Sequence, residues 1–227
     1  EIDANSQMLL EKARRDAETF GVDVETHTIL SHRSFEEIFD AARDHGADMT
    51  IAGWGGAHGS PGRVESALDD LTGDLPCDFV VYRDRGYDPS RILLPTSGGP
   101  DSDVSAEVAK VLRSEYDSEV TLLHIVGEES ERAAGEKFLK SWADERSLGD
   151  AERRIEVAED AYEKIREFSS DYSLLILGAT EKGILRRLTE RGLSDLVESA
   201  DISVMMAEQA RKRSLLERLF GDGGRGD

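Results

Sequence analysis

The chain repeats one pattern of apolar and polar positions. Residues 38–53 read IFDAARDHGADMTIAG, and residues 165–178 read IREFSSDYSLLILG. In both stretches, apolar residues at helical spacing lead into a short apolar run that ends on a glycine, which is typical of an amphipathic helix followed by a buried strand. A charged loop, a short helix and a last apolar strand then follow, and these last strands lie at residues 78–82 and 202–206. Gly53 and Gly178 are 125 residues apart, so the pattern predicts a repeat of about that length.

The second copy contains further elements ahead of this shared part. Residues 92–94 (ILL) and 120–126 (VTLLHIV) read as apolar strands, and the helix between them has an apolar face formed by Val104, Val108, Val111 and Leu112. Residues 101–103 should cap the start of that helix and supply its amino-terminal acids. The copy is completed by an edge strand at 154–158 and, before it, by a helix over about 131–146 with the buried stripe Phe138, Leu139 and Trp142.

Strands that alternate with helices predict an α/β fold with a parallel sheet and right-handed crossovers. The strands are apolar along their whole length, as they are when helices cover both faces of the sheet. We therefore expect two Rossmann-like, doubly wound parallel-sheet domains with strand order 3-2-1-4-5 and a ligand crevice beyond the carboxyl ends of the strands. The expected boundaries are a partial domain at 1–84, a linker at 85–90, a complete domain at 91–208, and a short helix with a flexible tail at 209–227.

The first copy is expected to be truncated at its amino terminus. Residue 1 already lies past the position of its first β-α-β, so this copy should retain three strands and lack the two central ones. The remnant would then have no continuous sheet, and preceding residues of a longer chain or another molecule would have to supply the missing strands. We also expect the last strands to pair, 79–82 against 202–206, either within the chain as a pseudo-dimer or between two chains.

The charge of the chain indicates which classes of protein it can belong to. There are 48 acidic and 28 basic residues, which gives a net charge of −20, and 38% of the residues are hydrophobic. Because periodic apolar strands exclude a disordered acidic chain, the pattern indicates a folded protein with a densely acidic surface. Such a surface is typical of proteins that stay hydrated in concentrated salt, and an ordinary acidic cytosolic protein is the alternative. The chain offers no basic field to a nucleic acid, which we exclude as a partner.

Residues suited to catalysis or metal binding are sparse. Cys77 is the single cysteine, which excludes an internal disulfide and a multi-cysteine zinc site. The five histidines show no metal-ligand spacing, although His124 lies in a strand from which it could face the crevice. We find no Ser/His/Asp order or carboxylate pair, and so expect neither an enzyme nor a metal site. Because the sequence has no signal peptide and no apolar run of membrane-spanning length, we expect a cytoplasmic protein.

Four segments resemble the universal stress protein (UspA-like) family. Residues 38–56 resemble its helix, G-A-D sequence and glycine-ended strand, and residues 92–98 (ILLPTSG) resemble its first strand. Residues 75–81 (LPCDFVV) and 200–206 (ADISVMM) resemble its last strand. The resemblance covers nearly the whole chain and implies a tandem universal stress protein of a salt-adapted archaeal type. It also implies the adenine nucleotide alpha hydrolase-like form of the fold, dimers through the last strands, and ATP binding in some members.

The nucleotide loop of that family, G-x2-G-x9-G-[S/T], is altered in both copies. In the first copy Gly53 and Gly56 fit, but no glycine stands at the third position. In the second copy Gly178 is present, whereas Glu181 replaces the second glycine and Arg191 the third. We do not expect tight ATP binding, because the carboxylate of Glu181 would repel phosphate. The cations of this stretch either hold an anion or form a solvated helix face: Lys182, Arg186, Arg187 and Arg191.

The candidate nucleotide or anion site consists of residues at strand ends and in the glycine loops: Ser97, Gly98, Gly178, Thr180, Lys182, Gly183, Gly192, Ser194, Gly53 and Gly56. Such a site would take ATP or AMP as its cofactor, but the altered loops do not indicate that either nucleotide binds. Our first hypothesis is a non-enzymatic module with a regulatory or ligand-sensing role. One alternative is the regulatory domain of an amino-acid or ion transporter, at the cytosolic face of the membrane with the transporter domain covalently attached upstream. The other is an ATP- or AMP-binding stress protein.

Overall fold

The computed structural model describes residues 4–27, 34–53, 75–178 and 191–210. By its internal contacts the chain divides into two compact units, residues 1–38 and residues 39–227. The first unit contains helix α1 (Ala4–Thr19), and helix α2 (Ser34–His45) begins in it. The expected tail helix lies outside the described residues, and the domain boundaries drawn from the repeat stay predictions.

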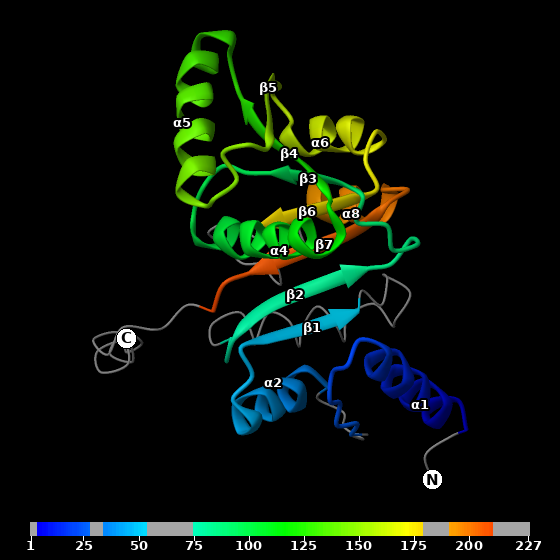
Figure 1. Cartoon of the computed structure of the whole chain (residues 1–227). Coiled ribbons are helices and arrows are strands. Elements are labelled where there is room, and N and C mark those ends of the chain that lie inside the picture. The colour runs from blue at the N-terminus through cyan, green and yellow to red at the C-terminus, as the bar shows by residue number, and fades with distance from the viewer. Residues whose placement is uncertain (1–3, 28–33, 54–74, 179–190, 211–227) are drawn as a thin grey trace, which may run out of the picture. The chain divides into compact units, whose positions relative to one another are not determined.

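The second unit is built on one sheet of seven strands (Figure 1). The strands are β1 (Met49–Gly53), β2 (Asp78–Arg83), β3 (Arg91–Pro95), β4 (Glu119–Val126), β5 (Glu152–Val157), β6 (Leu174–Gly178) and β7 (Ser203–Glu208). Their order across the sheet is β1-β2-β7-β6-β3-β4-β5. The second copy therefore has the order β5-β4-β3-β6-β7, which confirms the predicted 3-2-1-4-5 arrangement of parallel strands.

Helices cover the sheet of the second copy on both faces, as the apolar strands predict. They are α4 (Pro100–Tyr116), the 3-10 turn η1 (Glu129–Glu131), α5 (Arg132–Glu145), α6 (Ala161–Ser169) and α8 (Arg191–Ser199). Alternation along the strands separates the two faces. Leu122 of β4 packs in one cluster with residues of α4 and α5, whereas Leu123 faces a cavity lined by residues of α6 and α8. The mixed α/β, doubly wound class is thus confirmed.

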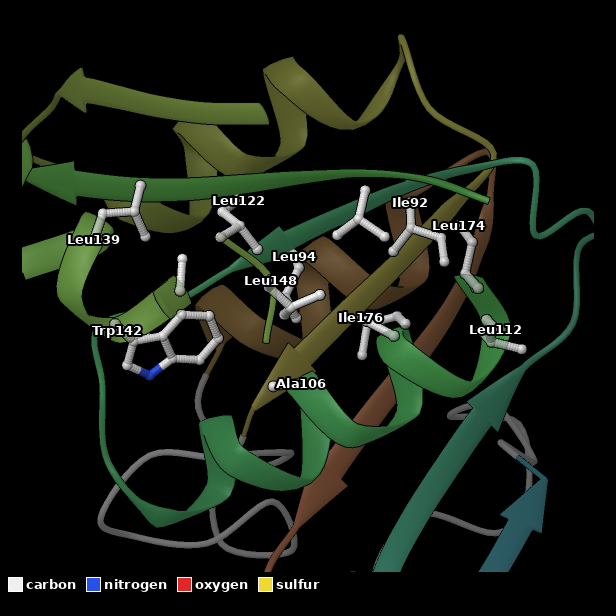
Figure 2. Close-up of a cluster of buried hydrophobic side chains, with 13 residues drawn as sticks. Ile92, Leu94, Ala106, Leu112, Leu122, Leu139, Trp142, Leu148, Leu174 and Ile176 are labelled. Atoms are coloured by element: carbon white, nitrogen blue, oxygen red, sulfur yellow. The ribbon is translucent and has the colours of Figure 1, made fainter. Parts of the chain in front are cut away.

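The main core lies between the sheet and the pair α4 and α5 (Figure 2). Strand residues such as Ile92 and Ile176 meet Ala106 of α4 and Leu139 of α5, all of them fully buried. Truncation of a large aliphatic side chain in such a cluster costs about 2–5 kcal/mol. Val111 does not share the buried face of α4 that was predicted for it, since 58% of its surface is exposed. The small residues of this helix are buried in its place, namely Ala106, Ala109 and Ser105.

Helix α4 starts without the side-chain cap expected from residues 101–103. Its N-cap is Gly99, with Pro100 in the first turn, and no side chain caps it. The φ angles of Gly98 and Gly99 are 85° and 95°, a region that glycine enters without steric cost. The buried carboxylate of Asp101 instead accepts a hydrogen bond of 2.9 Å from the backbone N–H of Gln209. Asp101 therefore ties α4 to the chain beyond β7, and Asp101 and Asp103 together add negative charge at the helix start.

The two copies join through their last strands. β2 pairs antiparallel with β7, and the two central residues of this ladder, Val81 and Met206, lie opposite one another. These two residues are themselves one repeat apart, so a local twofold axis relates the paired strands. Arg83 strengthens the junction, because its buried guanidinium donates hydrogen bonds of 2.7 and 2.8 Å to the carbonyl oxygens of Ala200 and Glu198 at the end of α8. A cation at a helix carboxyl end also interacts favourably with the helix dipole.

This junction corrects the expectation that the first copy would lack a continuous sheet. β1 and β2 extend the sheet of the second copy, because β2 bonds to β7 on one side and to β1 on the other. The third strand expected of the first copy would lie at about residues 29–33, one repeat before 154–158, and these residues lie outside the described ones. Association of two separate chains through the last strands stays a prediction. Across the described residues, no helix is long and apolar enough to cross a membrane, and no group of acidic, histidine or cysteine side chains could hold a metal ion.

Candidate ligand-binding site

A cavity of about 310 Å³ opens at the carboxyl ends of the parallel strands of the second copy. This is the position at which doubly wound sheets bind ligands, where neighbouring crossovers leave the sheet in opposite directions. The apolar part of its wall comes from β4, β6, β7, α6 and α8: Leu123, Ile125, Leu177, Met206, Ile165 and Leu193. The polar part consists of four hydroxyl side chains: Thr96, Ser97, Ser102 and Tyr162.

The loop between β3 and α4 and the first turn of α4 carry three of these hydroxyls, and hydrogen bonds fix two of them. The N–H of Thr96 donates to the carbonyl of Leu123 at 2.8 Å, which continues the β3–β4 ladder into the loop. The Thr96 hydroxyl accepts a bond of 3.1 Å from the N–H of Gly98, and the Ser102 hydroxyl donates one of 3.0 Å to the Gly98 carbonyl. Ser97 lies between them and is exposed at the rim. The loop is therefore held by its own hydrogen bonds, with Ser97 turned to the solvent side.

Gly178, a predicted site residue, lies in the cavity wall for a packing reason. A Cβ atom at this position would meet the Ser102 backbone nitrogen at 3.0 Å and the Asp101 carbonyl carbon and oxygen at 3.1 Å. The end of β6 thus approaches the first turn of α4 so closely that any larger residue would have to displace the backbone of that turn by a few tenths of an ångström. Gly98 is crowded by a side chain instead, since its Cβ would lie 3.2 Å from the ring of Phe138.

The charge of the described residues around the cavity does not favour an anion. None of the described residues that line it carries a charged side chain. The amino end of α4 contributes the positive end of a helix dipole, but Asp101 and Asp103 occupy the same turn and oppose it. The described part of the wall therefore suits a neutral, mainly apolar group with one or two hydrogen-bonding atoms.

The predicted site residues do not all come together. Ser97 and Gly178 line the cavity, and Gly98 belongs to the loop beside it. Gly192 and Ser194 lie in the first turn of α8. The other predicted residues of the two loops lie outside the described residues: Thr180, Lys182, Gly183, Gly56 and the cations Arg186 and Arg187. β1 runs antiparallel to β6, because β2 pairs antiparallel with β7. Gly53 and Gly178 both end their strands and therefore lie at opposite ends of the strands of the sheet.

His124 does not face the crevice, contrary to one expectation. Neighbours along a strand point to opposite faces, so Leu123 and Ile125 line the cavity while His124 points to α5. Its Nδ1 lies 2.8 Å from the Thr96 carbonyl oxygen, and its ring centroid lies 4.7 Å from that of Phe138. The carbonyl can only accept, so the Nδ1 atom carries the proton and the histidine is a structural residue of the α5 interface.

Sequence reasoning missed most of the cavity wall. Tyr162, Ile165 and Leu193 come from helices for which only an amphipathic pattern could be recognised in the sequence. The alternation in VTLLHIV contained a usable signal, because Leu123 and Ile125 must share a face that differs from that of Leu122 and His124. A combination of that alternation with the expected crevice would have assigned both residues to the site.

Comparisons with known proteins fit this architecture. No protein-family model matches the chain, and no curated protein matches it. Among solved structures, a universal stress protein from Archaeoglobus fulgidus DSM 4304 superposes with a TM-score of 0.63 at 15% identity, over 92% of this chain and 78% of the other. The chain has the universal stress protein fold.

Two further structures share the universal stress protein fold with this chain. A putative universal stress protein from Pseudomonas aeruginosa UCBPP-PA14 has a TM-score of 0.58 at 13% identity and covers 92% of this chain and 80% of its own. The cytoplasmic domain of a prokaryotic cation chloride cotransporter has a TM-score of 0.63 at 12% identity, over 90% and 81% of the two chains. Identities this low establish the arrangement of strands and helices alone.

Proposed function

We propose that this chain is a non-enzymatic regulatory module that binds a small ligand in the cavity of its second copy. The observation that carries the proposal is the cavity of about 310 Å³ at the switch point of the sheet, with an apolar wall and four hydroxyl groups. Ligand sites of proteins have volumes of about 300–1,000 Å³ and this mixture of apolar surface and few polar groups. A sensor needs such a binding site, and it needs no catalytic group there.

The chemistry of the wall supports binding rather than catalysis. Acyl, phosphoryl or proton transfer requires a nucleophile next to a base, a pair of carboxylates or a charged clamp. The described wall has hydroxyls, and the hydrogen bonds of Thr96 and Ser102 go to backbone groups of their own loop. These hydroxyls are therefore suited to orient a ligand.

For the nucleotide alternative, the nucleoside and the phosphates are considered separately. The apolar wall suits the uncharged part of adenosine, whereas the described wall gives its phosphates no cation. Adenosine should therefore bind at least as tightly as AMP, and AMP more tightly than ATP. A stress protein that recognises ATP through its phosphates would show the reverse order.

Calorimetric titration of the full chain in concentrated KCl with adenosine, AMP and ATP tests this proposal. The blocking variant is Ala161→Trp, because Ala161 lies in the cavity wall at the start of α6 and is exposed, so that an indole there fills the opening. The matched control is Ala134→Trp on an exposed position of α5. Loss of binding in Ala161→Trp alone supports the site. Saturable ATP binding that Ala161→Trp leaves intact, or no binding by any of a set of neutral small molecules, contradicts it.

The second candidate is a cytosolic regulatory domain of an amino-acid or ion transporter. The likeness to the cytoplasmic domain of a cation chloride cotransporter supports it, at the level of fold. In this setting the same cavity would sense a solute on behalf of an attached membrane domain, and the chain would lie at the cytosolic face. The reading frame around this sequence is the test: several apolar segments of about 20 residues support the transporter, and their absence favours a free cytoplasmic protein.

A further inference from the structure

The buried guanidinium of Arg83 joins the first copy to a helix that lines the cavity of the second. Arg83 is the last residue of β2, and its two terminal nitrogens donate hydrogen bonds of 2.7 and 2.8 Å to the carbonyl oxygens of Ala200 and Glu198. These carbonyls lie at the carboxyl end of α8, whereas Leu193, near the amino end of the same helix, lines the cavity. A residue of the first copy thus holds one end of an element whose other end belongs to the ligand site.

Helix α8 depends on support from outside the helix. It has nine residues, and helices this short are marginal in water on their own. The last carbonyls of a helix have no partner within it, and a buried carbonyl without a hydrogen bond costs free energy. Arg83 satisfies two carbonyls at this end, and its positive charge interacts favourably with the helix dipole there. Its guanidinium therefore fixes where the carboxyl end of α8 lies on the sheet.

The position of that end is transmitted to the cavity along the helix. Leu193 lies five residues before Glu198, which corresponds to about 7.5 Å along the helix axis. Leu193, Leu196 and Val197 are all buried, so the helix cannot turn about its axis without withdrawing this stripe from a close-packed interior. A shift of the carboxyl end must then move Leu193 relative to the rest of the cavity wall.

Strand β2 reaches α8 from the face of the sheet on which the cavity lies. Val81 stands opposite Met206 in the ladder between β2 and β7, and Met206 lines the cavity. Because alternate residues of a strand share a face, Arg83 lies on this face as well. Tyr82 points to the other face, where its hydroxyl lies 3.2 Å from the Ser203 hydroxyl of β7. Both side chains therefore bond across the junction of the copies, but the bonds of Arg83 go to α8.

We propose that Arg83 is a positioning residue of the ligand site, so that the first copy sets the place of Leu193, and with it the affinity of the cavity, through the carboxyl end of α8. This inference rests on the proposed function, because it assigns a regulator to the same cavity. The planar guanidinium suits the role, since it presents two donors to two carbonyls at once, whereas the ammonium of a lysine is a point charge. By linkage, a ligand that fixes Leu193 should in turn strengthen the contact between α8 and β2.

The test compares the unchanged full chain with Arg83→Met, Arg83→Lys and the matched control Tyr82→Phe. Arg83→Met keeps an apolar stem and removes both donors, whereas Arg83→Lys keeps the charge and can reach one carbonyl. Tyr82→Phe removes a hydrogen bond across the same junction that does not involve α8. The methyl resonances of Leu193, assigned with Leu193→Ile, and the hydrogen exchange of residues 193–200 are measured without ligand. Adenosine is then titrated into each chain by calorimetry.

Arg83→Met should shift the Leu193 resonances, speed exchange in α8 and weaken adenosine binding, the last two by about tenfold, as loss of one or two hydrogen bonds does. Arg83→Lys should give intermediate values, and Tyr82→Phe should match the unchanged chain. Circular dichroism shows whether each variant folds, and Arg83→Lys carries the comparison if Arg83→Met does not.

Three results would overturn the proposal: unchanged Leu193 resonances in Arg83→Met, equal shifts in Tyr82→Phe, or adenosine affinity that Arg83→Met leaves intact. Failure of the unchanged chain to bind adenosine would count against the proposed ligand instead. In that case the shift of the Leu193 resonances still decides whether Arg83 positions the cavity wall, because it is measured without ligand.

Discussion

Gly53 and Gly178 occupy equivalent positions of the repeat in different surroundings. Gly178 ends β6 against the backbone of Asp101 and Ser102, and Gly53 ends β1 with no atom near the place of a Cβ. Backbone atoms cannot rotate away from a new methyl group as the end of a flexible side chain does. Substitution should therefore cost stability at one glycine and not at the other, although the sequence pattern treats them alike.

Gly178→Ala should lower the free energy of unfolding by about 1–3 kcal/mol, because the added methyl group overpacks the turn that starts α4. Gly53→Ala should change it by less than about 0.5 kcal/mol, as substitutions at open positions do. Urea unfolding followed by circular dichroism measures both. Equal losses in the two variants would mean that the close approach of β6 to α4 does not constrain the position.

Tyr87 gives the fold a dependence on alkaline pH. Burial, and next its neighbour Tyr116, raise the pKa of the Tyr87 phenol from 10.0 to about 12, and the two rings meet edge to face at 6.0 Å. A raised phenol pKa means that the fold favours the neutral form. Its contribution to stability is therefore complete below pH 10 and is lost as the pH rises from 10 to about 12.

A phenolate absorbance titration should show a late component with a pKa well above 10, and Tyr87→Phe should reduce it. Burial also raises the pKa of Tyr82, whose ionisation should remain in the variant. The same variant should unfold with a smaller loss of stability over that pH range. An unchanged titration in Tyr87→Phe would assign the late ionisation to another of the five tyrosines.

At the scale of elements, the ladder between β2 and β7 holds the copies together. Val204 is fully buried and has Arg83 as its partner on one side and Leu175 on the other. Val204→Ala keeps the backbone N–H and should cost about 2 kcal/mol through the lost side chain. Val204→Pro also removes a ladder donor, which should add about 1 kcal/mol or more and expose apolar surface. Unfolding in urea with dye binding compares the two, and equal stabilities would contradict a continuous ladder.

The elements themselves were largely predictable from periodicity. The strands of the second copy and their order followed from continuous apolar runs and from the alternation of strands with helices. The rotation of α4 about its own axis was not predictable, because either Val111 or the small residues could face the sheet. Ala106 and Ala109 let the helix lie close to the sheet, and the larger Val111 then turns outward. Hydrophobicity alone ranks valine above alanine, whereas close packing reverses that order.

The site was less predictable than the fold. A glycine at the end of a strand suggested phosphate binding, but Gly178 is explained by the helix turn that it meets. The wall of the cavity depends on which helix residues from α6 and α8 reach the strand ends, and this is set by helix rotation in three dimensions. Sequence reasoning located the crevice, and it could not choose the residues that surround it.

At the scale of the whole molecule, the net charge of −20 should make stability depend on salt. Many ion pairs of the described residues join neighbours within one helix, such as Lys12 with Asp16 and Lys110 with Glu107, and these contribute little. Repulsion among the surplus carboxylates is screened as the Debye length falls from about 10 Å at 0.1 M salt to about 3 Å at 1 M. The midpoint of thermal unfolding should therefore rise with KCl.

Unfolding scans between about 0.1 M and 2 M KCl at neutral pH measure this rise. The control is the same series near the isoelectric point, where carboxylates have taken up protons and the salt effect should shrink. A midpoint that is indifferent to KCl at neutral pH would contradict the salt-adapted interpretation of the composition and leave the ordinary acidic protein.

The pairing of Val81 with Met206 places two equivalent residues of one polypeptide on a twofold axis. Two separate subunits with such a ladder would assemble only above a threshold concentration. A tether between them holds the effective concentration on the order of millimolar, so the joined state persists on dilution. Identical subunits would also acquire every substitution in both halves at once, whereas here each half can vary alone. One half of this chain can therefore keep a ligand cavity while the other half changes independently.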